Sequence, residues 1–292
     1  MSLSEYKQLI DSALPTFLPK ADGYADKLFE AMSYSALAPG KRLRPALCMI
    51  GAKLSGASGK VALPFACSIE MIHAYSLIHD DLPCMDDDNL RRGRPTCHKV
   101  YGEAIALLAG DGLLSHAFET MLAASVQLCE SDNERANCLR AAAYIAKCAG
   151  SGGMIAGQTA DMDHSGGTET LLFYIQKNKT SKLLMASIIS GLMLGGADAK
   201  MVNDFETFAS CFGAAFQITD DILDVIGDES VLGKPIGSDE EQNKLTAVSL
   251  WGLDGAKRRA SEYVEMAKSA IEGYEGAKEL AALADSLLSR RS

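Results

Sequence analysis

The sequence predicts an all-α fold, and three observations lead to this prediction. Apolar residues recur at helical spacing over long segments, and the alternation typical of strands is scarce. The breaks between these segments are short and rich in glycine or polar residues. No change in composition marks a boundary along the 292 residues, so we expect a single all-helical domain over residues 1–292 with about ten helices.

The predicted helices follow one another closely from residue 65 onward. They cover Phe65–His79, Gly102–Leu128, Glu134–Ala149, Thr168–Leu194, Asp204–Val225, Lys244–Gly252 and Ala256–Leu288. Short breaks are expected at residues 51–59, 164–167 and 195–199. Segment 227–243 is the longest predicted loop. Loops of this length often form lids or binding elements in compact domains, although a plain connector is the alternative.

The composition of the chain argues against several classes of protein. A net charge of −10 has the wrong sign for a nucleic-acid-binding surface. The eight cysteines form no Cys-x-x-Cys pair and no zinc-type spacing, which is typical of free thiols in a reducing cytosol. The N-terminus lacks the apolar segment of a signal peptide, and the longest apolar stretch, Leu183–Ala197, is too short to span a bilayer. We therefore expect a cytoplasmic protein without a membrane span or a nucleic-acid partner.

Two aspartate clusters carry most of the chemical information in the sequence. The first lies within residues 80–88 and the second within residues 220–224. Like charges this close repel one another, and bound cations would relieve that cost. Oxygen-only ligand sets suit hard ions, and magnesium usually binds one or two carboxylates together with substrate phosphates. Two such clusters facing each other would form a cage for magnesium and a polyphosphate, whereas either cluster alone is more often a solvated helix end.

The spacing within each cluster predicts its local structure. Asp220 and Asp224 are four residues apart and share one face of a helix. Asp80 and Asp86 are six residues apart with Pro83 between them, so we expect the first cluster to span a helix end and the following turn. An EF-hand is a poor alternative, because the required glycine and glutamate are missing in this register.

Two basic segments accompany the clusters. Residues 39–45 contain three cations within four positions, and residues 89–95 place three arginines directly after the first aspartates. Arginine forks bind phosphate oxygens in bidentate fashion, and lysine adds a point charge. A solvated basic turn is the alternative for each segment, and salt bridges to the nearby aspartates are an alternative for Arg91 and Arg92.

Further polar residues stand on the expected helix faces. His73 lies two helical turns before Asp80 on nearly the same face, although a lone histidine in an apolar helix is usually a core residue. Gln158 and Asp161 share one face of another helix. Gln217 stands three residues before the second cluster, so we expect it to point toward the same site.

In this order the motifs resemble those of the trans-isoprenyl diphosphate synthases, most of all the bacterial farnesyl diphosphate synthases. The residues that carry the resemblance are Gly40–Pro45, Asp80–Asp88 with Arg91-Arg92-Gly93, Gln158, Lys179-Thr180, Phe216-Gln217, Asp220–Asp224 and Lys244-Leu245-Thr246. The resemblance implies an isoprenoid-synthase-type helical bundle with a central cavity, acting as a homodimer. It also implies a magnesium-dependent prenyltransferase. Such an enzyme condenses isopentenyl diphosphate with dimethylallyl diphosphate and then with geranyl diphosphate, giving farnesyl diphosphate.

The resemblance also implies a role for each motif residue. About three magnesium ions would be held by Asp80, Asp86 and Asp220, with support from Asp81 and Asp224. The allylic diphosphate is assigned to Arg91, Lys179 and Lys234. Isopentenyl diphosphate is assigned to Lys41, Arg44, His73 and Arg92, with Lys244 as a further substrate-binding residue. Thr180 and Gln217 would present oxygens to the developing carbocation. The catalytic set implied is Asp80, Asp81, Arg91, Lys179, Thr180, Gln217 and Asp220.

Product length is a separate question. Each methylene buried in an apolar tunnel contributes about 0.8 kcal/mol, so growth of the chain must be blocked rather than merely disfavoured. In farnesyl-forming relatives an aromatic residue stands five positions before the first aspartate, which here is Tyr75, followed by Ser76. We therefore expect Tyr75 to limit the product to fifteen carbons, with an ordinary core role as the alternative. The insertion Pro83-Cys84 also occurs in plastid geranylgeranyl enzymes and does not decide the product.

Three other functions stay open as alternatives. A geranylgeranyl diphosphate synthase would share the mechanism and make a longer product. A non-catalytic subunit that binds a partner synthase typically loses an aspartate motif, and both motifs are intact here. A helical calcium- or magnesium-binding module would leave the basic segments unexplained.

Basic tails close over isopentenyl diphosphate in some relatives, and we expect the same of the tail at residues 290–292.

Overall fold

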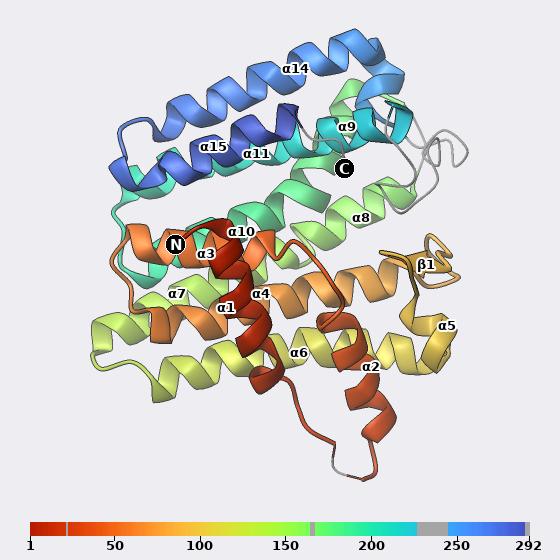
Figure 1. Ribbon diagram of the computed structural model, residues 1–292, viewed down its shortest axis with the longest axis vertical. Helices are drawn as coiled ribbons and strands as arrows, with labels where there is room; N and C mark the ends of the chain where they lie inside the picture. Colours follow the sequence, from red (N-terminus) through yellow and green to blue (C-terminus); the bar gives the residue numbers. More distant parts are fainter. Residues whose placement is uncertain (22, 164–166, 227–244, 290–292) are drawn as a thin grey trace. The chain divides into compact units, whose positions relative to one another are not determined.

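The structure, a computed structural model, describes residues 1–21, 23–163, 167–226 and 245–289 (Figure 1). These residues are helical almost throughout, and the β-structure among them is one short hairpin, so the predicted all-α fold is confirmed. The elements in chain order are α1 (Leu3–Phe17), α2 (Asp26–Ala36), α3 (Leu43–Leu54), α4 (Gly59–Asp80), β1 (Leu90–Arg91), β2 (Arg94–Pro95), α5 (Cys97–Tyr101), α6 (Glu103–Gln127), α7 (Asp132–Ala149), α8 (Met154–Met162), α9 (Glu169–Ile175), the π-helix η1 (Gln176–Ser181), α10 (Lys182–Leu194), α11 (Ala199–Ile226), α14 (Ala247–Ile271), the 3-10 helix η2 (Glu275–Ala277) and α15 (Lys278–Leu288). The predicted loop at 227–243 and the tail at 290–292 lie outside the described residues.

The chain divides into two compact units. The first consists of residues 1–145 and 190–197, and the second of residues 146–189 and 198–292. The first aspartate cluster and both basic segments belong to the first unit, whereas the second aspartate cluster belongs to the second. A single domain over residues 1–292 therefore stays a prediction.

Helix α4 forms the core of the first unit. It packs against α3 and α6, and Phe65, Ile69 and Ile72 are among its fully buried side chains. By length and composition alone, α4 is apolar enough to cross a membrane, and it is the one helix among the described residues that meets this criterion. However, 78% of its apolar window is buried inside the protein, as in the core helix of a folded domain.

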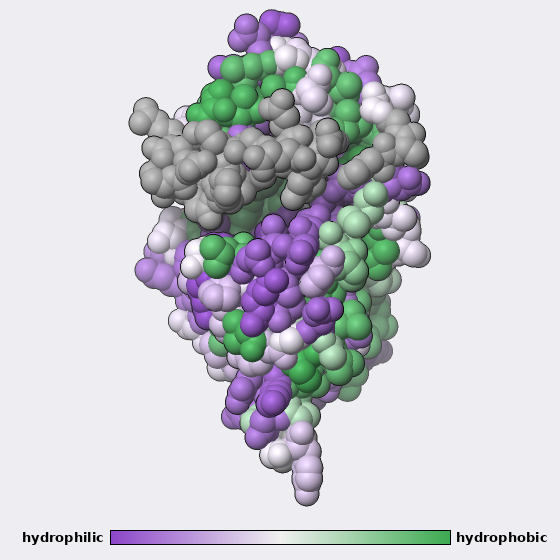
Figure 2. Space-filling model, turned by 90° about the vertical axis from the view of Figure 1, so that its right-hand side faces the viewer, coloured by the Kyte–Doolittle hydropathy of each residue, from purple (hydrophilic) through white to green (hydrophobic). Residues whose placement is uncertain are grey.

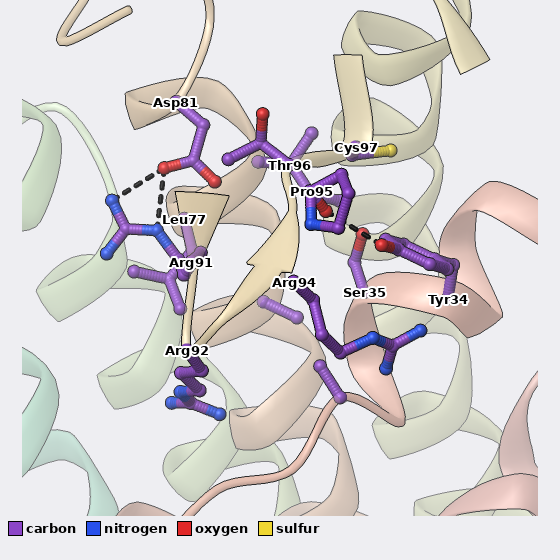
Figure 3. A pocket seen from close by; sticks show the side chains of 13 residues that line it. Tyr34, Ser35, Leu77, Asp81, Arg91, Arg92, Arg94, Pro95, Thr96 and Cys97 are labelled. Atoms are coloured by element: carbon purple, nitrogen blue, oxygen red, sulfur yellow. Dashed lines mark hydrogen bonds and ion pairs between the residues drawn. The ribbon is translucent and has the colours of Figure 1, made fainter. Parts of the chain in front are cut away.

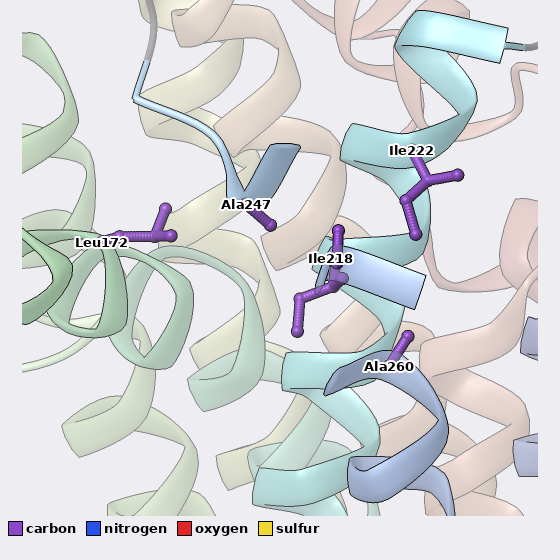
Figure 4. Packing of buried hydrophobic residues seen from close by; sticks show 6 residues of the cluster. Leu172, Ile218, Ile222, Ala247 and Ala260 are labelled. Atoms are coloured by element: carbon purple, nitrogen blue, oxygen red, sulfur yellow. The ribbon is translucent and has the colours of Figure 1, made fainter. Parts of the chain in front are cut away.

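Helices α11 and α14 dominate the second unit. They pack side by side, and a buried apolar cluster joins their facing surfaces (Figure 4). The cluster consists of Leu172, Ile218, Ile222, Ala247, Ala256 and Ala260. The eight cysteines, distributed over both units, are all free thiols, as the sequence predicts.

Some helix boundaries differ from the prediction. The predicted helix Thr168–Leu194 is divided into α9, η1 and α10, because residues 176–181 form a π-helix. The predicted helix Ala256–Leu288 ends at Ile271 and resumes at Lys278. Residues 51–54 extend α3 instead of breaking it, because Gly51 is buried and tertiary packing outweighs its low helix propensity.

Candidate functional site

The first aspartate cluster spans a helix end and the following turn, which confirms the predicted local structure. Helix α4 ends at Asp80, and the backbone N–H of Asp86 donates to the Asp80 carbonyl at 2.9 Å. Asp87 N–H donates to the Leu82 carbonyl at 3.1 Å and adopts a left-handed φ of 51°. The turn that contains Pro83 therefore returns the chain so that the Asp86 backbone meets that of Asp80. Both aspartate side chains are half-buried.

Asp81 points into the protein and pairs with Arg91. It is 4% exposed, and Arg91 Nε donates to its Oδ1 at 2.6 Å (Figure 3). Arg91 also contacts Asp88 Oδ2 at 2.9 Å. Burial raises the pKa of the Asp81 carboxyl, and the Arg91 charge offsets part of that rise. The predicted salt bridge is therefore present at Arg91, since the Asp81 carboxylate, just after the end of α4, fixes the direction of its guanidinium.

The hairpin β1–β2 places Arg92 at its tip. Leu90 pairs with Pro95 and Arg91 with Arg94, and the two turn residues Arg92 and Gly93 have φ of 53° and 73°. Two positive φ angles are what a two-residue hairpin turn of type I′ requires. On the face of the molecule that carries this hairpin, hydrophilic side chains gather (Figure 2).

The hairpin tip reaches the first basic segment. Arg92 Nη1 donates to the Pro39 carbonyl at 2.6 Å. A Cβ atom on Gly40 would lie 2.3 Å from the same nitrogen, so a larger residue there would require the end of the Arg92 side chain to shift. Lys41 is exposed and Arg44 is half-buried. The structure therefore brings together the two basic segments, which are about 50 residues apart in the chain.

Arg42 has a structural role that the sequence did not indicate. Its side chain is buried, and it donates to Glu70 Oε1 at 2.5 Å, to Asp11 Oδ1 at 2.8 Å and to the Ala38 carbonyl at 2.9 Å. A φ of 49° turns it inward between Lys41 and Leu43. The available signal is Glu70, a carboxylate within the mainly apolar helix α4, which requires a buried cation.

Backbone strain concentrates in this region. Among the described residues, the non-glycine positions with positive φ are Arg42, Asp87 and Arg92. Each costs of order 1–3 kcal/mol, and such residues cluster at functional sites. All three lie within or beside the motifs that the resemblance assigns to diphosphate and metal.

His73 lies in a positive electrostatic environment. Burial is the main cause that lowers its pKa well below 6.5, and the charges of Arg44, Arg92, Arg91 and Arg42 lower it further. The imidazole is therefore neutral at pH 7. A group of arginines that repels a proton from histidine attracts an anion.

Tyr75 is buried one helical turn before His79. It is 6% exposed, and burial together with the Asp80 charge raises its pKa to about 12. Its ring meets the His79 ring edge-on at 5.7 Å between centroids. His79 Nε2 lies 3.1 Å from the Leu107 carbonyl of α6. The neighbouring Ser76 hydroxyl donates to the His73 carbonyl at 2.9 Å, within its own helix.

Helix α2 holds the second strand of the hairpin. The Tyr34 hydroxyl donates to the Pro95 carbonyl at 2.7 Å, and the Arg94 guanidinium lies 4.4 Å above the Tyr34 ring. A cavity of about 50 Å³ lies beside these contacts, lined among others by Ala74, Ile78 and Cys97 (Figure 3). The Tyr34 hydroxyl and the Arg94–Tyr34 contact therefore connect the hairpin to α2 beside this space.

In the second unit, the π-helix carries Lys179 and Thr180. Lys179 Nζ pairs with Asp161 Oδ2 of α8 at 2.5 Å. A Cβ atom on Gly157 would lie 2.1 Å from the Lys179 backbone nitrogen, so α8 contacts the π-helix directly. Gln158 Nε2 is buried there without a hydrogen-bond partner among the described residues. π-Helical turns are rare and occur frequently at functional sites.

Three side chains and one backbone amide form a hydrogen-bonded chain in the second unit. Thr180 Oγ1 donates to Gln217 Oε1 at 2.9 Å, and Gln217 Nε2 donates to Asp221 Oδ1 at 2.9 Å. The backbone N–H of Ala247 donates to Asp221 Oδ2 at 2.8 Å. Thr180 and Gln217, assigned together by the resemblance, are therefore in direct contact.

The carboxylates suit magnesium by their donor chemistry. Asp80, Asp86 and Asp220 are half-buried, whereas Asp224 is 2% exposed. Within the part of the chain that the structure describes, no group of three or more His, Cys, Asp or Glu side chains is close enough to hold a metal ion. Magnesium needs only one or two carboxylates when phosphates supply the other ligands, so these residues fit. Lys234 and Lys244 lie outside the described residues.

Comparison with known proteins identifies the relatives of this chain. Residues 25–283 match the family model described as polyprenyl synthetase. The chain is 49% identical over 271 residues to the farnesyl diphosphate synthase of Geobacillus stearothermophilus. The aligned residues cover 91% of this chain and 89% of that protein. It is 40% identical over 295 residues to the geranylgeranyl diphosphate synthase of Cyanophora paradoxa, covering 99% and 96%. Among solved structures, an FPP/GFPP synthase from Zymomonas mobilis superposes with a TM-score of 0.86 at 31% identity, covering 98% of this chain and 97% of that one.

Proposed function

Because this chain belongs to the polyprenyl synthetase family, we propose that it is a farnesyl diphosphate synthase. It condenses isopentenyl diphosphate with dimethylallyl diphosphate and then with geranyl diphosphate. The observation that carries the proposal is the contact between the two basic segments beside the first aspartate turn. Several arginines around a neutral His73 favour a multiply charged anion such as a diphosphate.

Magnesium is the metal that this site would bind. Asp80, Asp86 and Asp220 would hold it, with Asp224 in support. When bound, magnesium would neutralise the negative charge that develops on the departing pyrophosphate.

The cations of the protein bind the two substrates. Arg91 and Lys179 are assigned to the allylic diphosphate, and both are already oriented, by Asp81 and Asp161 respectively. Preoriented charges need no rearrangement as negative charge develops. Lys41, Arg44 and Arg92 are assigned to isopentenyl diphosphate, where the neutral His73 can donate a further hydrogen bond. Holding both substrates in register contributes roughly 7–11 kcal/mol against the barrier.

Breaking the allylic carbon–oxygen bond leaves a positive charge that Thr180 and Gln217 would face. The Thr180 proton is directed toward Gln217, so the lone pairs of the hydroxyl oxygen are available to a cation. The double bond of isopentenyl diphosphate then attacks the cation. The departing pyrophosphate accepts the proton that is lost, so the reaction requires no protein base.

A cytoplasmic homodimer completes the proposal. Leu107, Leu108, Leu122 and Val126 on α6 are 47–72% exposed. Several exposed apolar side chains along one helix support burial against a second copy of the chain, because isolated soluble proteins rarely expose a contiguous apolar surface. The free thiols fit a reducing compartment.

Geranylgeranyl diphosphate is the alternative product, since a synthase of that product is also a relative at 40% identity. The buried Tyr75 favours the shorter product. A non-catalytic subunit is the weaker alternative, because both aspartate motifs are present.

The test is the chain length of the product formed from labelled isopentenyl diphosphate, dimethylallyl diphosphate and magnesium. We expect fifteen carbons. Twenty carbons would retain the reaction and replace the product with the geranylgeranyl one. The absence of any product, with dimethylallyl or geranyl diphosphate as the starter, would overturn the catalytic proposal.

A further inference from the structure

We propose that Asp221 is a positioning residue, which orients the Gln217 amide and, through it, the Thr180 hydroxyl toward the allylic cation. Asp221 would then not be a magnesium ligand, although it lies in the same motif as Asp220. This inference rests on the proposed function of the site.

The hydrogen bonds of Asp221 are directed into the protein. Its side chain is 4% exposed, and each of its two oxygens accepts a hydrogen bond from a different element. Oδ1 accepts from Gln217 Nε2 of α11 at 2.9 Å, and Oδ2 accepts from the Ala247 N–H of α14 at 2.8 Å. These bonds fix the carboxylate from both sides.

A carboxylate at this position determines the direction of the hydrogen bonds that follow. Because a carboxylate only accepts, Gln217 must turn its NH₂ group toward Asp221 and its carbonyl toward Thr180. The Thr180 hydroxyl must then donate to that carbonyl, at 2.9 Å. The remaining face of the Thr180 oxygen carries lone pairs. The negative charge of Asp221 polarises these two hydrogen bonds. It thereby increases the partial negative charge on the Thr180 oxygen that a cation would meet.

Buried apolar residues lie beside Asp221. Ile218 and Ile222 lie within one turn of Asp221 on α11 and are 0% and 8% exposed. Ala247 of α14 is 0% exposed (Figure 4). Dipoles in such an apolar environment interact more strongly than in water.

Asp220 differs from Asp221 in its environment. Consecutive residues of an α-helix point about 100° apart. Asp220 is accordingly half-buried, whereas Asp221 is enclosed. One motif therefore contains two carboxylates with different surroundings, and we assign only the first to magnesium.

The experiment compares Asp221→Asn with Asp220→Asn. For each variant, kcat with geranyl and isopentenyl diphosphates, both Michaelis constants and the magnesium concentration for half-maximal activity are measured. We expect Asp221→Asn to lower kcat about 10- to 100-fold, with Michaelis constants and magnesium requirement within about twofold of wild type. We expect Asp220→Asn to raise the magnesium requirement. Thermal melting and circular dichroism verify that each variant folds.

A double variant tests whether Asp221 acts through Gln217. In the Gln217→Leu background, Asp221→Asn should cause no further fall in kcat, because the connection to Thr180 is already lost. A multiplied loss in the double variant, or a raised magnesium requirement in Asp221→Asn, would overturn the inference. Should Asp221→Asn not fold, Asp221→Glu takes its place, since it keeps the charge but displaces the carboxylate from Gln217 and must lower kcat at an unchanged magnesium requirement. Turnover by the wild-type protein in the same assay separates a failure of this inference from a failure of the proposed function.

Discussion

The two aspartate clusters share a sequence pattern and differ in what their second aspartate contacts. Asp81 and Asp221 are each 4% exposed and hydrogen-bonded within the protein. Asp81 accepts from Arg91, so it orients a cation that suits a phosphate. Asp221 accepts from Gln217, so it orients a chain of neutral dipoles that ends in a hydroxyl oxygen. We therefore propose that the partner of each buried carboxylate, rather than its place in the motif, determines its role.

The largest loss of turnover is expected from removing the first aspartate of either cluster. We predict that Asp80→Ala or Asp220→Ala lowers turnover at least about 1000-fold, because each removes a carboxylate assigned to magnesium. Steady-state turnover measures the loss, and circular dichroism verifies the fold. Near-wild-type turnover in either variant would break the assignment of both clusters to the metal.

Asp81→Asn and Asp221→Asn should change different kinetic parameters. Loss of a charge-assisted hydrogen bond to Arg91 is worth about 1.5–3 kcal/mol, so we predict a rise of about 10- to 100-fold in the Michaelis constant for the allylic diphosphate. The magnesium requirement and kcat should change little, in contrast to Asp221→Asn, which should lower kcat. If Asp81→Asn instead lowered kcat alone, the proposed difference between the clusters would be wrong.

Product length should depend on helix α4, which ends at the first aspartate cluster. We predict that Tyr75→Ala lengthens the product to twenty carbons or more, because it removes a buried ring next to His79. Chromatography of the labelled product gives the chain length, and the rate of the first condensation serves as the control. An unchanged chain length would remove Tyr75 from this role.

The contact between Tyr34 and the hairpin should have a smaller effect. Tyr34→Phe removes the donor to the Pro95 carbonyl and keeps the ring below Arg94, so we predict a rise of about 3- to 10-fold in the Michaelis constant for isopentenyl diphosphate. Arg91 retains its bond to Asp81, so the allylic substrate should be less affected. Tyr101→Phe is the matched control, since its ring packs edge-on against Tyr34 at 5.6 Å. Equal Michaelis constants in both variants would contradict the role of Tyr34.

The smallest effect concerns the pH dependence of stability. His73 has a lowered pKa in the folded protein, so below pH 6.5 the unfolded chain binds a proton that the folded chain does not. The free energy of unfolding should therefore fall as the pH decreases from 6.5, by at most about 1.4 kcal/mol per pH unit. Urea denaturation at pH 5.5 and 7.5 should show a weaker dependence in His73→Asn than in wild type. Identical slopes would show that the pKa of His73 is not lowered in the folded protein.

Much of the fold followed from local pattern, because burial periodicity is a property of each segment alone. The turn after Asp80 was predictable for the same reason, since Pro83 ends the helix. The N-terminal helices α1, α2 and α3 are not among the predicted helices, which begin at Phe65.

The contacts within the site could not be predicted in this way. Thr180 and Gln217 are 37 residues apart, and no spacing rule joins them without the packing of η1 on α11. Arg42 was grouped with its basic neighbours, but its backbone conformation turns it inward to Glu70. The side-chain direction at a left-handed residue is set by tertiary structure, and the one sequence signal, the carboxylate of Glu70, does not say which of the neighbouring cations pairs with it.

The π-helix η1 has a consequence for how this chain tolerates insertions and deletions. A single π-helical turn within an α-helix holds an additional residue, and η1 lies directly between α9 and α10. Deleting Asn178 would restore regular α-helical geometry and leave α10 close to its present register, because a π-helical turn accommodates an additional residue locally. Leu183, Leu184 and Ile188 would therefore stay buried. The change would fall on the turn itself, so a single deletion there would redirect Lys179 and Thr180 while the helices on either side keep their packing.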